Sequence, residues 1–357
     1  MYKLLLAWRY LRTRYIALAS IISVTLGVGT LIVVNSVMAG FAHEMHIRLH
    51  SILADIVFEA HGMDGFTNPQ WHVDEIKKVV GPDLKGITYA VHVPAMVNVP
   101  VRGQWVTRQI SLVGVDENTY ADVSDFREYL LHPGNREKLS FTLRESGYGD
   151  DKHPMPPAGW AYRRLKVEYE REMQHEQEQL LKAQQVPNAM QPIGPNEGVK
   201  TEAKPEGAVA ANPPADPFAS KQSNLPVDTF DPAKDQFSGV IMGIAIGSAR
   251  QRDSEGKVID YFLCRPGDDV RITFPSAGQP PKAMSDMFTV VDFYESKMSE
   301  YDSTFAFIPL RRLQEMRGMI DPATGTEAVT TIQMRLKPGA DLNAVRDKLR
   351  ARFPADQ

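Results

Sequence analysis

The stretch YIALASIISVTLGVGTLIVVNSVMAG, residues 15–40, determines how the rest of this chain is organised. It contains no charged residue, and it is long enough to cross a bilayer core as a helix, which takes about 20 apolar residues. A cleaved signal peptide has an apolar core of only about 7–15 residues and a small-x-small cleavage site. This stretch runs into VMAGF, which fits such a site poorly. The sequence therefore predicts a permanent transmembrane helix over residues 15–41.

Basic residues precede the apolar stretch, which predicts its orientation. Residues 1–14 contain no acidic side chain and four basic ones, Lys3, Arg9, Arg12 and Arg14. Positively charged flanks stay on the cytoplasmic side. We therefore expect residues 1–14 to be cytoplasmic and everything after residue 40 to lie outside the inner membrane. Residues 1–14 are also amphipathic, so they either simply flank the span or lie on the membrane lipid as a surface helix that touches a cytoplasmic partner.

The overall composition excludes several classes of function. The chain has 357 residues, a formal net charge of -4 and a pI of about 6.2, which gives no support for a nucleic-acid partner. Its single cysteine, Cys264, cannot form an internal disulfide and is expected to be buried in a strand. The sequence lacks the G-x-S-x-G and H-E-x-x-H motifs of common hydrolases. We therefore predict a non-enzymatic chain with no catalytic residues and no cofactor.

Small residues recur at four-residue spacing within the predicted span. Ala19, Ser23 and Gly27 share one helical face, and small residues let a second membrane helix approach closely. We interpret this face as a helix-packing surface, because a helix that serves only as an anchor needs none. The alternative is that glycine is simply frequent in membrane helices.

The helix is expected to continue past the membrane through FAHEMHIRLHS, residues 41–51. His43, His46 and His50 share one face of this extension. Metal binding would need a further ligand cluster, and the sequence shows neither such a cluster nor zinc-type cysteine spacing. We therefore expect this face to be a helix surface or an interface, with no metal.

The remainder of the chain alternates between strand and helix patterns, which predicts an α+β domain. Strands are expected at residues 54–60, 86–93, 95–101, 107–115, 239–247, 259–264, 269–274, 288–294, 304–308 and 328–336. Helices are expected at residues 73–80, 309–316 and 341–353, the last one capped by Asp341. Arg102 and Gly103 form a predicted hairpin turn.

The composition changes over residues 145–237. Residues 163–185 are highly charged and nearly free of core residues, which is typical of a solvated single helix. Residues 186–232 contain nine prolines. Such a segment cannot bury enough apolar surface to fold, so we predict a disordered insert.

Five ordered segments carry a family resemblance. They are LAWRYLRTR at 6–14, LGVGTLIVVNSVMAGF at 26–41, VGVD at 113–116, VIMGIAIG at 240–247 followed by RPGDDVRITFPSAG at 265–278, and FTVVDFYESKMSEYDSTFAFIPL at 288–310. These segments resemble the permease subunits of lipoprotein-releasing ABC transporters, the LolC and LolE type, within the broader MacB/FtsX-like permease superfamily. Together they span nearly the whole chain outside residues 145–236.

The resemblance implies a protein of the bacterial inner membrane with a two-lobed periplasmic domain. Residues 42–144 and 304–357 would form a porter-like α+β lobe, and residues 238–303 would form a mainly-β lobe inserted between them. It also implies a cytoplasmic ABC ATPase subunit as a partner, since the chain has no Walker A motif. The ATPase would drive extraction of an acylated lipoprotein from the inner membrane, and the lipoprotein would pass to a periplasmic carrier.

The sequence departs from the family in three respects. The family has three further membrane helices after the outer domain, whereas this sequence ends at Gln357. We interpret the chain as a truncation, a fragment or one half of a split permease, which then needs a second permease subunit or the missing helices. The insert over residues 145–236 has no family counterpart. Asp292 stands where the family motif has glycine.

The resemblance also implies a carrier-binding loop. In the carrier-recruiting subunit of the family, a hairpin loop holds the carrier, and the matching residues here are PSAGQPPKAMSDM, residues 275–287. This loop begins like the family loop, with PSA, but it is shorter. An ordinary hairpin connection is the alternative. The candidate contacts are Pro275, Ser276, Gly278, Gln279, Pro280, Lys282 and Met284.

A lipoprotein leaving the bilayer would need apolar surface where the helix exits the membrane, because its acyl chains are apolar. Five side chains lie there at roughly helical spacing, and they are either lipoprotein contacts or core contacts to the porter-like lobe. They are Val37, Met38, Phe41, Met45 and Leu49.

The sequence therefore favours a permease subunit, or its N-terminal part, for lipoprotein release. Two alternatives are other members of the superfamily: a MacB-like efflux or mechanotransmission permease, and an FtsX-like regulator of cell-wall hydrolases. The third is a singly anchored scaffold that uses the fold without ATP. The first and second of the five segments favour lipoprotein release, whereas the insert is neutral toward it or mildly against it.

Overall fold

A computed structural model describes residues 15–52, 54–101, 103–149, 154–184, 230–252 and 258–354, together with residues 2, 3 and 9. The chain divides into two compact units, residues 1–54 and 55–357. Most of the predicted cytoplasmic segment and nearly all of the predicted disordered insert lie outside the described residues.

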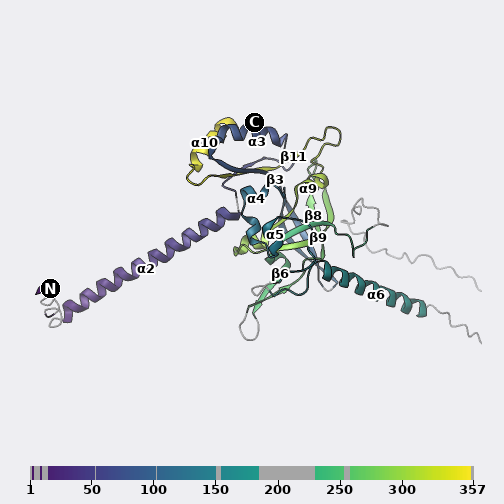
Figure 1. Ribbon diagram of the computed structural model, residues 1–357, viewed down its shortest axis with the longest axis horizontal. Coiled ribbons are helices and arrows are strands. Elements are labelled where there is room, and N and C mark those ends of the chain that lie inside the picture. Colours follow the sequence, from purple (N-terminus) through teal and green to yellow (C-terminus); the bar gives the residue numbers. More distant parts are fainter. Residues whose placement is uncertain are drawn as a thin grey trace, which may run out of the picture. The chain divides into compact units, whose positions relative to one another are not determined.

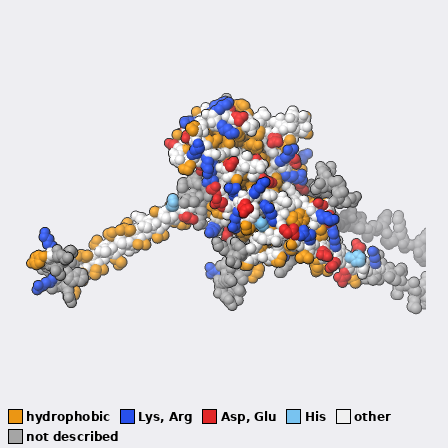
Figure 2. All heavy atoms as spheres, viewed as in Figure 1, with side chains coloured by type: hydrophobic (Ala, Val, Ile, Leu, Met, Phe, Trp, Pro, Cys, Tyr) orange, Lys and Arg blue, Asp and Glu red, His pale blue; other side chains and the backbone are white. Residues whose placement is uncertain are grey.

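The first unit contains one long helix, α2 (Tyr15–Ile52). Within it, Leu18–Glu44 is long and apolar enough to cross a membrane, and Figure 2 shows apolar side chains along its length. An apolar helix of this kind near the N-terminus is either a membrane anchor or a signal sequence. The predicted helical continuation through residue 51 is confirmed.

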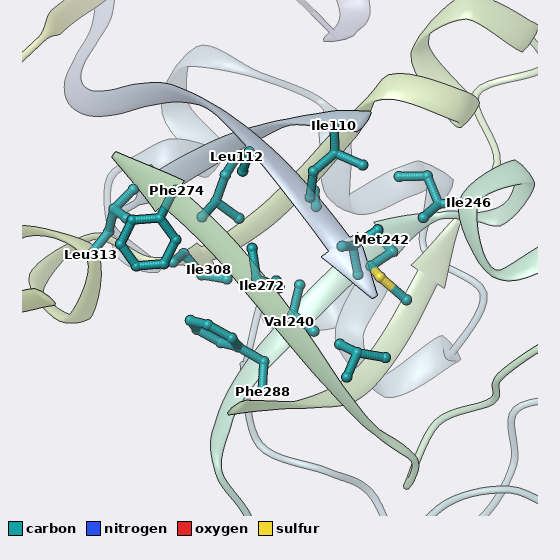
Figure 3. Close-up of a cluster of buried hydrophobic side chains, with 14 of the residues drawn as sticks. Ile110, Leu112, Val240, Met242, Ile246, Ile272, Phe274, Phe288, Ile308 and Leu313 are labelled. Atoms are coloured by element: carbon teal, nitrogen blue, oxygen red, sulfur yellow. The ribbon is translucent and has the colours of Figure 1, made fainter. Parts of the chain in front are cut away.

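Six strands of the second unit close into a barrel. Around the barrel they follow the order β3, β4, β10, β5, β9 and β8, and β8 pairs again with β3. Their bounds are β3 (Leu84–Val101), β4 (Gln104–Val115), β5 (Ser238–Gly243), β8 (Asp269–Pro275), β9 (Ala283–Tyr294) and β10 (Phe305–Pro309). Side chains of alternate residues fill the interior, as expected for a small barrel, and Figure 3 shows Ile110, Val240 and Ile272 among them.

The first half of β3 extends beyond the barrel into a second layer. There it pairs with β12 (Thr331–Leu336), which pairs in turn with β1 (Ile56–Glu59). The helices α3 (Pro69–Val80) and α10 (Leu342–Arg352) contact each other and cover this part of the sheet (Figure 1). The predicted α+β class is confirmed, and the barrel strands and this layer share one eight-stranded sheet.

The predicted break between two strands at Pro94 is wrong, because β3 runs through it without interruption. Proline lacks the N–H that a central strand needs. The backbone N–H of His92 donates to the Thr330 hydroxyl on the side of β3 away from β4, and the nitrogen of Pro94, two residues later, points to the same side. On that side β12 ends its pairing at Ala90 and β8 begins at Met96. Pro94 therefore loses no ladder hydrogen bond.

Two other predicted strands also end differently. The strand predicted over 239–247 stops at Gly243 and is followed by one helical turn, α7 (Ile244–Gly247). A continuous apolar run does not by itself distinguish strand from helix. The strand predicted over 328–336 divides at Thr330 into β11 (Ala328–Val329), which pairs with β2 (Phe66–Thr67), and β12. Cys264 is buried as expected, but it lies just after a strand, β7 (Val258–Phe262).

The remaining described elements lie around this sheet. A segment with short helices, residues 116–149, packs on the outer side of β9 and β10 through aromatic residues such as Phe126 and Tyr294. The helices of this segment are α4 (Tyr120–Val123), the 3-10 helix η2 (Phe126–Tyr129) and α5 (Pro133–Glu137). The remaining helices of the second unit lie outside it; they are the 3-10 helix η1 (Gly81–Asp83), α6 (Trp160–Gln184), α8 (Ser299–Thr304) and α9 (Leu310–Arg317). Strand β6 (Ser248–Arg252) forms a separate hairpin with β7.

The predicted capping of α10 by Asp341 is confirmed. The Asp341 carboxylate accepts hydrogen bonds from the backbone N–H groups of Asn343 and Ala344.

Candidate functional site

The hairpin between β8 and β9 contains the predicted carrier-binding loop. The two strands pair from Asp269 with Thr289 as far as Pro275 with Ala283. Strand β9 therefore begins at Ala283 rather than at the predicted Phe288, and the connection shortens to residues 276–282. The strand is longer than predicted because residues 283–287, which precede the apolar run that begins at Phe288, also pair with β8. One of these contacts is between the Thr273 and Ser285 hydroxyls, which lie 3.1 Å apart.

Hydrogen bonds close the base of this loop. The backbone N–H of Ser276 donates to the carbonyl of Lys282 over 2.8 Å. In return, the backbone N–H of Lys282 donates to the Ser276 hydroxyl over 3.0 Å. The loop is therefore held at both of its ends, and its tip projects from a defined base.

Arg317, the last residue of α9, holds the β8 side of the hairpin. Its Nε donates to the carbonyl of Pro275 over 3.1 Å and its Nη2 donates to the carbonyl of Met63 over 2.6 Å. The carbonyl of Arg317 accepts from the backbone N–H of Ala277 over 3.0 Å. Burial lowers the pKa of Arg317. Such a desolvated guanidinium is retained because backbone carbonyls satisfy its donors.

A second arginine of α9 holds the β9 side. Arg312 forms an ion pair with Asp286, with Nη2 and Oδ2 2.8 Å apart. Asp286 also accepts a hydrogen bond from the backbone N–H of Met287. The helix α9 therefore contacts both strands of the hairpin, through Arg312 on the β9 side and Arg317 on the β8 side.

The tip of the hairpin is solvent-exposed. Gly278, Gln279, Pro280, Lys282 and Met284 are exposed, whereas Pro275 and Ser276 are half-buried at the base. Lys282 is the one charged side chain among residues 275–285. A rigid loop with apolar residues and a single cation can bind a protein surface, but it holds no acid–base pair or nucleophile. Among the described residues no group of side chains could hold a metal ion.

The structure places the predicted membrane-helix residues on α2. Ala19, Ser23 and Gly27 are all exposed, and a Cβ at Gly27 would meet nothing within 4 Å. Val37, Met38 and Phe41 are exposed as well. The side chains of Met45 and Leu49 lie outside the described residues, although their backbone is helical.

Asp292, the residue that departs from the family motif, is fully buried on β9. Its carboxylate accepts hydrogen bonds from the Asn135 side chain over 2.8 Å and from the backbone N–H of His132 over 3.3 Å. Burial raises the pKa of Asp292 to about 7, while these hydrogen bonds and nearby Arg136 oppose the rise. The carboxylate thus fastens α5 and its flanks to the barrel.

The sequence did not predict that Arg312 and Arg317 anchor the β8–β9 hairpin. Arg312 and Arg317 lie in the predicted helix over 309–316 or just after it, but Arg311 beside them is exposed. All three arginines lie in the same predicted helix or directly after it, and the sequence pattern does not show which of them is buried. Only the packing of α9 against the hairpin distinguishes the two that anchor it from the one that does not.

No protein-family model matches this chain. No curated protein gives a significant match either.

Proposed function

We propose that this chain is a permease subunit, or the N-terminal part of one, in an ABC transporter that releases lipoproteins from the bacterial inner membrane. Cytoplasmic ATP hydrolysis by a partner subunit would drive extraction, because exposing each buried acyl CH2 to water costs about 0.8 kcal/mol. The helix α2 would pack on a second permease subunit, or on further membrane helices, through Ala19, Ser23 and Gly27. Residues 42–144 and 304–357 would act in the periplasm as a porter-like lobe, and residues 238–303 as a mainly-β lobe inserted into it.

The observation that carries this proposal is the β8–β9 hairpin. An ordinary connection between antiparallel strands takes about 2–5 residues and needs no outside support. Here residues 276–282 form a longer loop, and Arg312 and Arg317 of α9 anchor its two strands. A projecting tip on a rigid base is what a carrier-binding loop requires, because preorganisation lowers the entropic cost of binding.

The test replaces residues 277–281 with Asn-Gly, which joins Ser276 to Lys282 through a two-residue turn. The complex is purified in mild detergent from its native membrane, and the bound proteins are identified by mass spectrometry. We expect the periplasmic carrier to disappear while the ABC ATPase still co-purifies and the thermal unfolding midpoint is unchanged. A carrier that remains bound would show that the loop does not hold it.

The same purification separates this function from the other members of the superfamily. An ATPase recovered with acylated lipoproteins or with the carrier supports lipoprotein release. Recovery of cell-wall hydrolases would instead indicate an FtsX-like regulator. Recovery without any ATPase would indicate a singly anchored scaffold.

The proposed lipoprotein contact at Val37, Met38, Phe41, Met45 and Leu49 has a separate test. Photo-crosslinking amino acids at Phe41 and Met45 should capture lipoprotein in the assembled complex. Crosslinks that form only within residues 55–357 would instead make this segment a core contact of the outer domain.

A further inference from the structure

The helix α6 begins within the barrel's outer layer and then leaves it. Side chains of its first two turns, such as Arg163 and Val167, are buried. From Glu168 to Lys182 every side chain is exposed. This outer part extends over about four turns, since an α-helix has 3.6 residues per turn.

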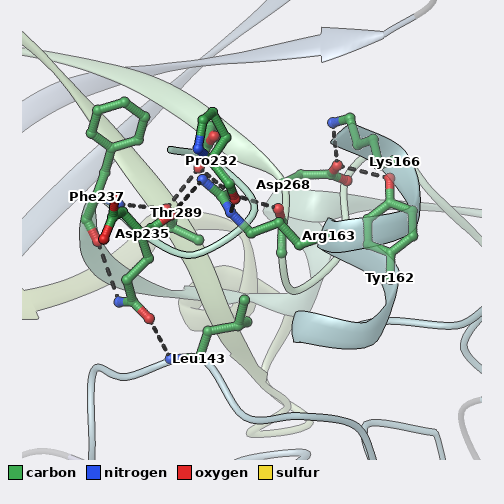
Figure 4. Close-up of polar contacts among 12 residues, drawn as sticks. Leu143, Tyr162, Arg163, Lys166, Pro232, Asp235, Phe237, Asp268 and Thr289 are labelled. Carbon is green, nitrogen blue, oxygen red and sulfur yellow. Dashed lines mark hydrogen bonds and ion pairs between the residues drawn. The ribbon is translucent and has the colours of Figure 1, made fainter. Parts of the chain in front are cut away.

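Arg163 fixes the base of α6 (Figure 4). Its Nη1 donates to the Asp269 carboxylate over 2.7 Å and to the carbonyl of Gly267 over 2.9 Å. Its Nε donates to the carbonyl of Pro232 over 2.8 Å. One buried guanidinium therefore joins α6, the turn before β8 and the chain that returns after the insert.

Neighbouring side chains make further contacts at the base of α6. The Tyr162 hydroxyl and the Lys166 ammonium both donate to Asp268, over 2.9 and 2.7 Å. One turn further along, Arg171 forms an ion pair with Asp231 over 2.7 Å. The direction in which α6 leaves the barrel is therefore set by several charged contacts, which suits a fixed arm better than a loose linker.

One face of α6 carries an apolar row that begins just before the outer part and continues along it. Leu165, Tyr169 and Met173 follow each other at four-residue spacing, and Leu180 continues on the same face one heptad after Met173. All four are exposed large hydrophobic residues. A surface helix normally turns such a row toward a core, and no described residue covers this one.

An acidic row runs beside the apolar row. Glu168, Glu172 and Glu176 also follow at four-residue spacing, and none of them forms an ion pair with a described residue. Like charges at this spacing destabilise a helix that stands alone. The range 168–182 contains five glutamates against Arg171 and Lys182. This surface therefore favours a basic partner and disfavours a second acidic one.

We propose that the outer part of α6 is a docking arm for an amphipathic helix of a partner protein, whose apolar row is flanked by lysine or arginine. The partner's apolar row packs on Tyr169, Met173 and Leu180, and its basic side chains meet Glu168, Glu172 and Glu176. A second copy of this chain would bring its own glutamate row against the first one. An anionic membrane surface would be repelled for the same reason.

Two adjacent leucines supply a matched pair of variants. Leu180 and Leu181 are 58% and 59% exposed, but they point about 100° apart around the helix, so only Leu180 lies in the apolar row. Glutamine is a good helix former, so Leu180→Gln and Leu181→Gln keep the helix and remove one apolar side chain each.

The probe is a synthetic amphipathic helix with one leucine row flanked by lysines, and its control has glutamate in place of each lysine. Binding to the full chain in detergent is followed by fluorescence anisotropy. We expect the lysine peptide to bind, about tenfold weaker binding to Leu180→Gln, and unchanged binding to Leu181→Gln. Added salt should weaken the interaction, because exposed charges are screened. Equal binding of both peptides, or equal effects of both variants, would overturn the proposal.

Crosslinking in the native membrane identifies the occupant itself. A photo-crosslinker replaces Met173 in the full chain, and the linked peptides are sequenced. A peptide from another protein with a basic amphipathic pattern supports the proposal. A link to a second copy, a link to residues 185–229 of the same chain, a link to lipid, or no link at all would each contradict it.

Discussion

Arg317 at the end of α9 donates a hydrogen bond from its Nε to the carbonyl of Pro275, the last residue of β8, over 3.1 Å. The same guanidinium also donates to the carbonyl of Met63. One buried side chain thus connects the exposed hairpin to the segment after β1. Strand pairing alone would not fix the hairpin in this way, because β8 meets β3 only as far as Thr273.

Arg317→Ala should destabilise the domain and loosen the hairpin. It leaves two backbone carbonyls without a donor and opens a space, so we expect the free energy of unfolding to fall by about 2–4 kcal/mol. The measurement is chemical denaturation of the detergent-solubilised chain. Arg311→Ala is the control on the same helix, because Arg311 is exposed and, among the described residues, pairs only with Glu315. Equal effects of the two variants would show that Arg317 is not an anchor.

Asp292 should make stability depend on pH near neutrality. Burial raises the pKa of Asp292 to about 7, whereas the pKa of an aspartate in an unfolded chain is about 4. Between these values the folded protein retains a proton that the unfolded chain has lost. The free energy of unfolding therefore falls as pH rises from about 4 to about 7, and the contribution is constant above that.

Asp292→Asn removes this contribution, so the variant should gain stability relative to the parent by about 2 kcal/mol as pH rises from 5 to 7. Burial lowers the pKa of neighbouring His132, which acts with the opposite sign but is common to both proteins. Denaturation at several pH values measures the difference between the two curves. Parallel curves would mean that Asp292 is ionised throughout this range.

Gly243→Ala should be strongly destabilising. An added Cβ would overlap the carbonyl of Asp302, a backbone group that cannot move aside without shifting α8. We expect a loss of about 3 kcal/mol or more, or a protein that does not fold. Gly278→Ala is the control, because a Cβ there meets only the Ser276 hydroxyl at 3.9 Å. Thermal unfolding of both variants decides whether Gly243 is retained for this close approach.

A charge in the centre of α2 should weaken its insertion into the membrane. Val28→Arg places a guanidinium in the middle of the apolar span, which costs about 2.5–3.5 kcal/mol on insertion scales. Extraction of membranes with alkaline carbonate should release more of the variant than of the parent. Intact-mass measurement of the parent tests whether α2 is an anchor, because a signal sequence would be removed and the mass would be lower.

The apolar pattern of the sequence was enough to predict the apolar helix, the α+β class and most element positions. Periodicity is a local property: Leu18–Glu44 is apolar throughout, and the strands and helices alternate in pattern and in turn residues. Asp341 was recognised as a helix cap for the same reason, since its partners are two and three residues away. The candidate loop also followed from local resemblance, although its strands extend further than the apolar run indicates.

Three features could not be predicted from the sequence and are seen only in the folded chain. They are how Pro94 fits inside a strand, which arginines of α9 support the hairpin and where Arg163 joins distant segments. Each of these depends on groups that are far apart in the chain. Pro94 is tolerated because neighbouring strands leave a gap on one side of it. Arg163 is buried because carbonyls from residues 232 and 267 reach its guanidinium. Hydrogen bonds between segments that are far apart in the chain produce no periodic pattern in the sequence, so they are seen only once the chain is folded.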